Sequence, residues 1–158
     1  MTNKKFMTEE TPIRMLKSDH RKVEGLFNEC RQINPNDMEE RMDKIKKIAK
    51  ELEIHMDLEE QIFYPEVEKF SEEGSGMIKH AKEEHQKIKG IIGSLKNAME
   101  GNKIEDQKLQ ELETRVTEHV KDEEEKVFPF AEANLSDVLG MTFAAKMLAI
   151  KEKIRFQK

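Results

Sequence analysis

Two copies of one short pattern contain the residues of this chain that are best suited to chemistry. Each copy has a histidine, two glutamates four and five residues later, and then an aromatic residue followed by proline; the copies run from His55 to Pro65 and from His119 to Pro129. On an α-helix, side chains four residues apart lie on the same face, so each copy presents an imidazole nitrogen and a carboxylate oxygen together. The pattern predicts half of a metal site, present twice.

Two further histidines extend the repeat. His20 lies 35 residues before His55, and His85 lies 34 residues before His119. This spacing indicates that the two halves of the chain are copies of one helical hairpin, and that the copied feature is a set of ligands. The candidate metal ligands are His20, His55, Glu59, His85, His119 and Glu123.

The segments that carry these residues have the periodicity of amphipathic helices. Apolar residues recur three and four positions apart, and the six candidate ligands occupy the same inward-facing positions. Gly74-Ser75-Gly76 is expected to break the chain before the third helix, and Pro65 to kink or end the second. Helices of comparable length with short connections predict an all-α fold, an up-down-up-down antiparallel four-helix bundle with an additional C-terminal helix. The four bundle helices are expected over residues 12–32, 38–70, 78–99 and 109–129.

The chain is expected to divide into three parts. Residues 1–10 form a flexible N-terminal arm, residues 11–134 the bundle, and residues 135–158 a C-terminal helix. That last helix is predicted to be capped near Ser136 and to carry an apolar stripe that starts at Leu139. The stripe favours packing on the bundle or a contact within an oligomer, and the sequence leaves both open.

Composition narrows the class of protein. Of 158 residues 39% are charged, with a net charge of -5 and no basic face of the kind that binds nucleic acid or anionic membranes. Cys30 is the one cysteine, so no internal disulfide can form. No apolar run reaches the ~20 residues of a membrane span, and the N-terminus has no apolar signal core. We therefore expect a cytoplasmic protein without nucleic-acid or membrane partners.

Six ionisable residues in one core layer require a shared partner. A lone buried histidine is more often a hydrogen-bonded core residue, but an uncompensated buried charge costs several kcal/mol against a domain stability of ~5–15 kcal/mol. Two cations would satisfy the set, each held by two histidines, with Glu59 and Glu123 and an oxo or hydroxo group as bridges. Such a centre leaves one position open on each metal. The donors favour two iron ions, with manganese second and zinc third.

The same residues resemble the hemerythrin family, in its bacterial hemerythrin-like cation-binding form, over roughly residues 11–134. The matching motifs are Leu16-Lys17-Ser18-Asp19-His20, Glu83-Glu84-His85, and the two repeats that end in Tyr64-Pro65 and Phe128-Pro129. The resemblance implies a non-haem di-iron centre inside a four-helix bundle, bridged by Glu59 and Glu123. It also implies a function in binding or sensing O2 or a related small oxidant.

One position departs from the oxygen-carrying members, which have a fifth histidine four residues before the ligand on the third helix. Here that position is Ala81, and the nearby His80 is about 140° away from His85 around the helix. The remaining set looks more like di-iron proteins associated with nitric oxide stress and iron-sulfur cluster repair. The alternative function is therefore an enzyme or repair protein that acts on peroxide or nitric oxide or donates iron. A third hypothesis is an interaction module with a structural metal.

Several other side chains are weighed against simpler explanations. Glu24, His80 and Glu124 remain open as additional ligands, although Glu24 is expected on a solvated flank. Glu60 and Glu124 should point away from the metal, with water or lysine as partners. Tyr64 could hydrogen-bond a ligand or donate a proton, but packing at a helix end is the commoner use of such a residue. Cys30 is interpreted as a core residue. The apolar walls of a dry pocket are assigned to Leu52, Ile62, Phe63, Ile88 and Val116.

Overall fold

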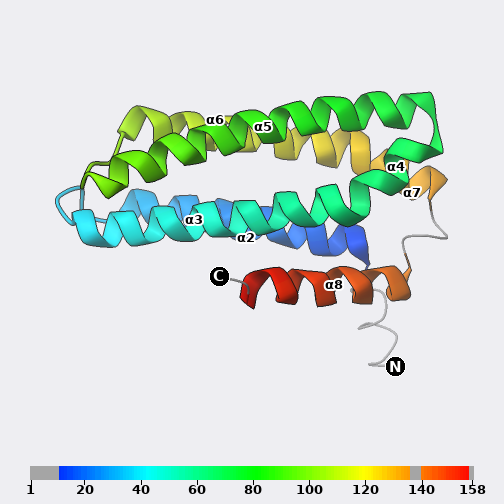
Figure 1. Cartoon of the computed structure of the whole chain (residues 1–158), viewed down its shortest axis with the longest axis horizontal. Coiled ribbons are helices and arrows are strands. Elements are labelled where there is room, and N and C mark those ends of the chain that lie inside the picture. Colours follow the sequence, from blue (N-terminus) through cyan, green and yellow to red (C-terminus); the bar gives the residue numbers. More distant parts are fainter. Residues whose placement is uncertain (1–10, 136–139, 157–158) are drawn as a thin grey trace.

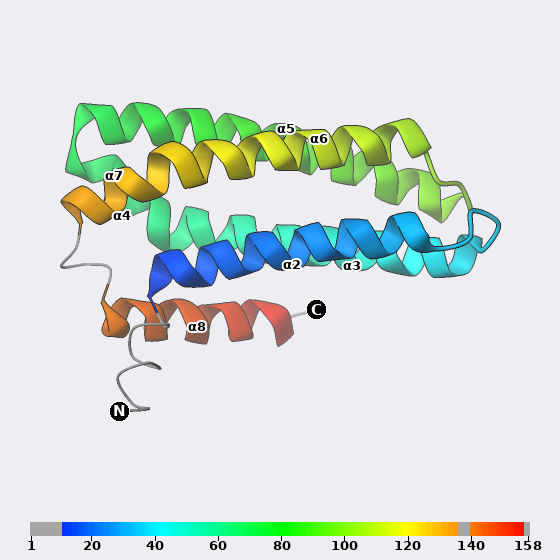
Figure 2. The same ribbon diagram turned by 180° about the vertical axis from the view of Figure 1, so that it is seen from behind.

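The computed structural model describes residues 11–135 and 140–156, and all regular structure in these residues is helical. Four long helical rods run alternately up and down and form a bundle, and a fifth helix lies outside it (Figures 1 and 2). This confirms the predicted all-α, up-down-up-down bundle with an additional C-terminal helix. The helices are α2 (Pro12–Gln32), α3 (Met38–Leu58), η1 (Glu59–Phe63), α4 (Tyr64–Phe70), α5 (Glu72–Glu100), α6 (Asp106–Asp122), η2 (Glu123–Val127), α7 (Phe128–Asn134) and α8 (Met141–Phe156).

Local sequence signals start the first two rods. Thr11 caps α2 by accepting a hydrogen bond from the Arg14 N–H at 3.2 Å, and Pro12 occupies the first turn, where its missing N–H is tolerated. Asp37 caps α3 in the same way, accepting from the Glu40 N–H at 3.1 Å. These caps fix where each rod begins, and so fix the height of the histidines along it.

The expected break at Gly74-Ser75-Gly76 is wrong, because both glycines lie inside α5. The chain breaks earlier, at Ser71, whose extended backbone and side-chain hydroxyl cap the helix by accepting from the Gly74 N–H at 3.1 Å. A Cβ on Gly74 would lie 2.2 Å from the carbonyl oxygen of Val67 in α4. Glycine is therefore needed here for close approach of α4 and α5 rather than as a helix breaker.

The second and fourth rods each contain one turn of π-helix, η1 and η2, that begins at the first glutamate of the repeat. In each turn an N–H donates to the carbonyl five residues back: Tyr64 to Glu59, and Phe128 to Glu123. Pro65 does not end its rod, because it follows the π turn in the first turn of α4, where a proline is accommodated. The sequence did not predict either π turn.

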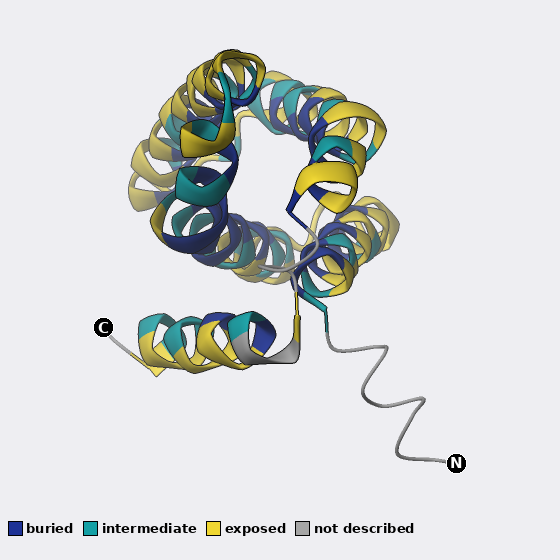
Figure 3. Cartoon of the chain, turned by 90° about the vertical axis from the view of Figure 1, so that its right-hand side faces the viewer, coloured by how far each residue is buried: buried dark blue, intermediate teal, exposed yellow. Residues whose placement is uncertain are grey.

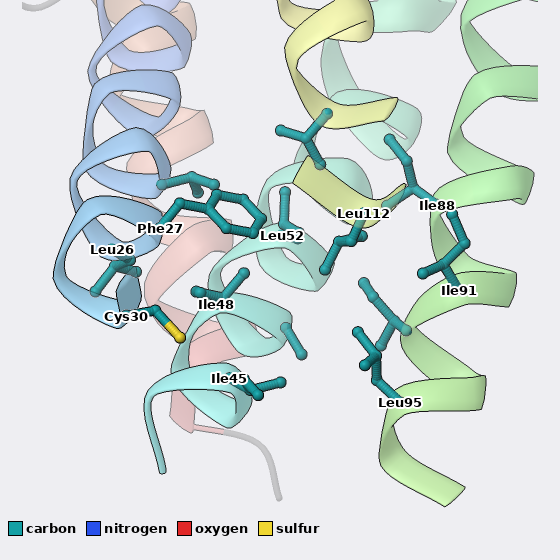
Figure 4. Packing of buried hydrophobic residues seen from close by; sticks show 14 of the residues in the cluster. Leu26, Phe27, Cys30, Ile45, Ile48, Leu52, Ile88, Ile91, Leu95 and Leu112 are labelled. Carbon is teal, nitrogen blue, oxygen red and sulfur yellow. The ribbon is translucent and has the colours of Figure 1, made fainter. Parts of the chain in front are cut away.

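The inward faces of the four rods are buried and their outer faces exposed (Figure 3). The core has two apolar clusters. One, formed mainly by α2, α3, α5 and α6, includes Val23, Leu52 and Ile88 and is drawn in part in Figure 4. The other, at the end where η1, α4, η2 and α7 lie, includes Leu16 and Phe128. On α2, His20 falls between Leu16 and Val23, so a polar layer separates the two clusters.

Helix α8 packs along the outside of α2 and α3 (Figures 1 and 2). Its Ala144 and Met147 are buried, and Lys151 forms an ion pair with Asp19 of α2. Arg155 pairs with Glu51 of α3 at 2.7 Å. An oligomer contact through α8 stays a prediction. Three earlier assignments, the N-terminal arm, the cap near Ser136 and the stripe residue Leu139, lie outside the described residues.

Within the described ranges, no helix has the length and apolar character needed to cross a membrane.

Candidate metal centre

The structure brings all six candidate ligands into the polar layer between the two apolar clusters. Each is almost completely buried, with an exposed fraction of 4% or less. They form two groups of potential metal donors, each with two histidines and both glutamates, whose donor atoms lie within 4.8 Å of one another. The first group has His20 and His55, and the second has His85 and His119.

The two glutamates divide their oxygens between the groups. In Glu59, Oε2 lies 3.2 Å from His55 Nε2, and Oε1 lies 3.0 Å from His85 Nε2. In Glu123, Oε1 lies 3.1 Å from His20 Nε2, and Oε2 lies 3.4 Å from His119 Nε2. Both carboxylates are thus oriented as bridging carboxylates would be.

Every histidine of the layer has a carboxylate on its other ring nitrogen. His55 Nδ1 is 3.0 Å from Asp19, and the remaining three distances are between 2.6 and 2.7 Å. A carboxylate accepts a hydrogen bond from Nδ1–H, which fixes the tautomer and leaves the Nε2 lone pair facing inward. The remaining pairs are His20 with Glu124, His85 with Glu60 and His119 with Glu84.

This tautomer makes the layer fit a metal. His20 Nε2 and His55 Nε2 are 3.2 Å apart, and His85 Nε2 and His119 Nε2 are 3.1 Å apart. Two lone pairs at that separation repel unless a proton or a cation lies between them. Glu59 Oε2 is in addition a buried oxygen that lacks a hydrogen-bond donor, which is costly unless a positive group compensates it. Imidazole nitrogens and carboxylate oxygens are donors for first-row transition metals.

The layer also determines which groups carry charge before a metal binds. Burial and the charge of Glu123 raise the pKa of Glu59, but its interactions with the nearby imidazoles of His55 and His119 outweigh both and hold it at about 2. Burial lowers the pKa of His55, but the Glu59 charge and the hydrogen bond to Asp19 raise it well above its usual range. Metal ions must therefore compete with protons for the imidazoles.

Glu60 and Glu124 lie outside both donor groups, as predicted, but their contacts with the histidines of the facing helices were not predicted. Glu60 does point away from its own His55, but it reaches the facing hairpin, where it accepts from His85 Nδ1 at 2.6 Å and from Lys89 at 3.3 Å. Glu124 accepts from His20 Nδ1 at 2.7 Å and pairs with Arg21. These contacts were missed because the helical spacing describes one helix and not the facing one.

Tyr64 has a larger part in the layer than the sequence indicated. The π turn places Tyr64 one turn beyond Glu59 along the rod. Its hydroxyl lies 3.0 Å from Glu59 Oε1 and 3.2 Å from His85 Nε2. The hydroxyl also donates to Glu123 Oε2. Burial and the charges of Glu123 and Glu59 raise the pKa of Tyr64 well above its usual range, so it is a neutral donor.

The corresponding residue of the other half is Phe128. Its ring stacks on His20 at a centroid distance of 5.7 Å, as the Tyr64 ring stacks on His85 at 5.3 Å. The two halves are therefore similar in ring packing but differ in one hydroxyl. A metal in the second group would have a proton donor beside it that a metal in the first group would lack.

Comparison with known proteins agrees with this geometry. The family model described as hemerythrin HHE cation binding domain matches residues 11–131. The chain belongs to this family. A solved hemerythrin HHE cation binding domain-containing protein from Mycobacterium kansasii has the same fold, with a TM-score of 0.77 at 23% identity, covering 92% of this chain and 87% of that one.

Two curated relatives are similar in sequence. A DNA nickase of Nostoc sp. is 29% identical over 154 residues, which cover 98% of this chain and 42% of the nickase. An uncharacterized hemerythrin-like protein of Schizosaccharomyces pombe is 27% identical over 135 residues, which cover 85% of this chain and 66% of that protein. The chain thus spans less than two thirds of the length of either relative.

Within this hemerythrin fold, the structure also places the remaining candidates. His80 lies on the surface with its side chain 62% exposed, and Glu24 is an exposed residue 3.6 Å from Arg21. Ala81 is buried in the apolar cluster that contains Phe128, and Cys30 is buried in the other cluster. None of these four side chains belongs to either donor group.

A small cavity lies against the centre on the side of the Leu52 cluster. It has room of about 10 Å³ for the centre of a water-sized molecule, about enough for one water. Of the predicted apolar walls, Leu52, Ile88 and Val116 line it, whereas Ile62 and Phe63 belong to the other cluster. The unpredicted apolar residues of its lining are Val23, Met56 and Val120.

Proposed function

We propose that this chain is a non-haem di-iron protein that binds or senses O2 or a related small oxidant. The observation that carries the proposal is the division of the Glu59 and Glu123 oxygens between two histidine pairs. Such a division is what two cations with shared carboxylates require, and one tetrahedral metal would need only four donors. The proposed ligands are His20, His55, Glu59, His85, His119 and Glu123.

Iron is the metal we propose because the donors are nitrogen and oxygen with no thiolate. When bound, iron would supply a redox-active Lewis acid with a position open to a small ligand. The protein's own part is to orient and isolate it. The Nδ1 carboxylates hold each imidazole in one tautomer and one ring orientation, and the apolar walls at Leu52, Ile88 and Val116 keep bulk water from the cavity.

The size and lining of the cavity support a small ligand. Room for about one water leaves no space for an organic substrate, so a ligand of this cavity has to be a very small molecule. The activity of the Nostoc nickase is not extended to this chain, which spans 42% of that protein and has a net charge of -5.

Tyr64 supports a second candidate, an enzyme or repair protein that acts on peroxide or nitric oxide. Its hydroxyl is a neutral proton donor in contact with both bridging carboxylates. Reduction of peroxide or nitric oxide consumes protons, and a donor at this place can supply them. Reversible O2 binding has no such requirement for net proton uptake.

Metal analysis with optical spectroscopy tests both candidates. The purified protein should contain about two irons per chain, and Glu59→Ala or Glu123→Ala should lose them, while Glu125→Ala, which alters an exposed neighbour, should not. Full iron retention in both bridge variants would refute the assignment. Ferrous protein mixed with O2 should give a visible band that disappears on removal of O2; irreversible oxidation with turnover of added peroxide or nitric oxide would favour the enzyme.

A further inference from the structure

A second set of metal donors lies on the surface between α5 and α6. His80 and Glu84 are one turn apart on α5, and Asp122 is the last residue of α6. His80 Nε2 is 3.2 Å from Glu84 Oε2 and 3.4 Å from Asp122 Oδ2, and one donor atom from each residue lies within 4.8 Å of the others. We refer to His80, Glu84 and Asp122 as the surface triad.

Glu84 connects the surface triad to the buried centre. Its Oε1 accepts from His119 Nδ1 at 2.7 Å, and its Oε2 faces His80. One carboxylate thus touches a proposed iron ligand with one oxygen and an exposed histidine with the other. Glu84 of the surface triad is thus in direct contact with the buried centre.

The pseudo-symmetry of the chain favours a cation on the outer oxygen of Glu84. Asp19 precedes His20 as Glu84 precedes His85, and Asp19 also supports a histidine, His55, through one oxygen. The other oxygen of Asp19 is paired with the Lys151 ammonium of α8. The first half of the protein therefore neutralises its supporting carboxylate with a fixed positive charge.

In the second half, α8 does not occupy the corresponding place, and the outer oxygen of Glu84 faces His80 and Asp122 instead. Two carboxylates and one imidazole then converge where the first half has a lysine. Lys126 lies 3.9 Å from the other oxygen of Asp122 and is largely exposed, so it leaves the converging atoms accessible. Imidazole with two carboxylates is a donor set for divalent first-row metals.

We propose that the surface triad binds a divalent transition-metal ion and is the point at which iron enters the buried centre. The ion takes the place that Lys151 has in the first half. From there, Glu84 reaches His119 of the buried centre. The entry role depends on the proposed di-iron function, whereas binding to the triad does not.

Manganese is the probe for binding, because Mn2+ is the weakest of the divalent first-row metals and will not displace iron. Iron-loaded protein is titrated with Mn2+, and free Mn2+ is followed by its EPR signal. We expect one site that is weakened about tenfold or more by His80→Ala or Asp122→Asn, a loss of the size found when a metal site loses a supporting group. Glu83→Gln, which removes an exposed carboxylate next to the triad, is the matched control.

Loading kinetics test the entry role. Metal-free protein is mixed anaerobically with limiting Fe2+, and uptake is followed to completion. His80→Ala should slow uptake severalfold and reach the same final iron content as wild type. Unchanged Mn2+ affinity in His80→Ala and Asp122→Asn refutes the site, and weakened Mn2+ binding with an unchanged uptake rate refutes the entry role. Failure of the di-iron function would appear separately, as wild-type protein that retains no buried iron.

Discussion

Replacing Tyr64 with phenylalanine makes the two halves of the centre alike and removes one buried hydroxyl. That hydroxyl donates to ionised Glu123 and lies 3.0 Å from ionised Glu59. A hydrogen bond to a charged group contributes about 1.5–3 kcal/mol to stability. Since Glu59 Oε1 keeps its contact with His85 at 3.0 Å, the loss should stay within this range. For a chain of 158 residues, each kcal/mol corresponds to about 2–4 °C in Tm, so we expect Tyr64→Phe to lower Tm by about 3–12 °C.

The measurement is thermal unfolding by circular dichroism, on protein freed of metal with a chelator so that only protein contacts contribute. Ser75→Ala is the control, because it also removes one hydroxyl, but from an exposed position on α5. It should change the stability by less than about 0.5 kcal/mol. If Tyr64→Phe and Ser75→Ala have the same Tm, the Tyr64 hydroxyl does not stabilise the buried layer. Its assignment as a proton donor to the centre would then also be wrong.

Three further predictions concern packing, pH and the support of the ligands. Gly74→Ala should destabilise the protein by about 1–3 kcal/mol in urea titrations, because its Cβ would meet the Val67 carbonyl at 2.2 Å, whereas Gly76→Ala, with open space around it, should be neutral or stabilising. Burial lowers the pKa of His55, His85 and His119, but the neighbouring carboxylates outweigh burial and raise all three pKa values above the usual range. The charged imidazoles therefore stabilise metal-free protein fully below pH ~6.5, and this contribution is lost as the pH rises through the raised pKa values. Metal affinity should rise with pH in the same window, because a binding metal displaces protons from the imidazoles. Calorimetry in buffers of different ionisation enthalpy measures this proton release. Metal binding without proton release would contradict the raised pKa values. Asp19→Asn should weaken metal binding by about 10–100-fold in chelator competition. Lys151→Met should weaken it less, because Lys151 acts only through Asp19. An equal or larger effect of Lys151→Met would contradict this reasoning.

The sequence predicted what lies along one helix better than what lies between helices. The spacing of four residues between His55 and Glu59 places both side chains on one face of the rod, and the apolar stripe shows that this face points inward. These two facts were enough to predict the bundle and to group the six residues in one layer. Their role as metal ligands stays a proposal, because the geometry fits a metal but does not identify one.

The contacts that were missed depend on the rotation of one rod against another. Helical spacing relates Glu60 only to His55 on its own rod, whereas its partner is His85 on the facing hairpin. The π turn that aligns Tyr64 with Glu59 has no signature in helix propensity. One signal could have revealed two of the four supporting carboxylates, Asp19 and Glu84: each immediately precedes a histidine of the layer.

The ion pair between Lys151 and Asp19 gives the last helix a thermodynamic connection to the centre. Asp19 shares its two oxygens between Lys151 on α8 and His55 in the layer, so a change in the charge of either partner alters the other contact. Linkage is reciprocal: whatever free energy a bound metal adds to the docking of α8, the docking of α8 adds to metal binding. A modification or a binding partner that detaches α8 from the bundle would therefore change the metal affinity without contact with any ligand. Metal binding at the centre would in turn change how tightly α8 docks on the outside of the bundle.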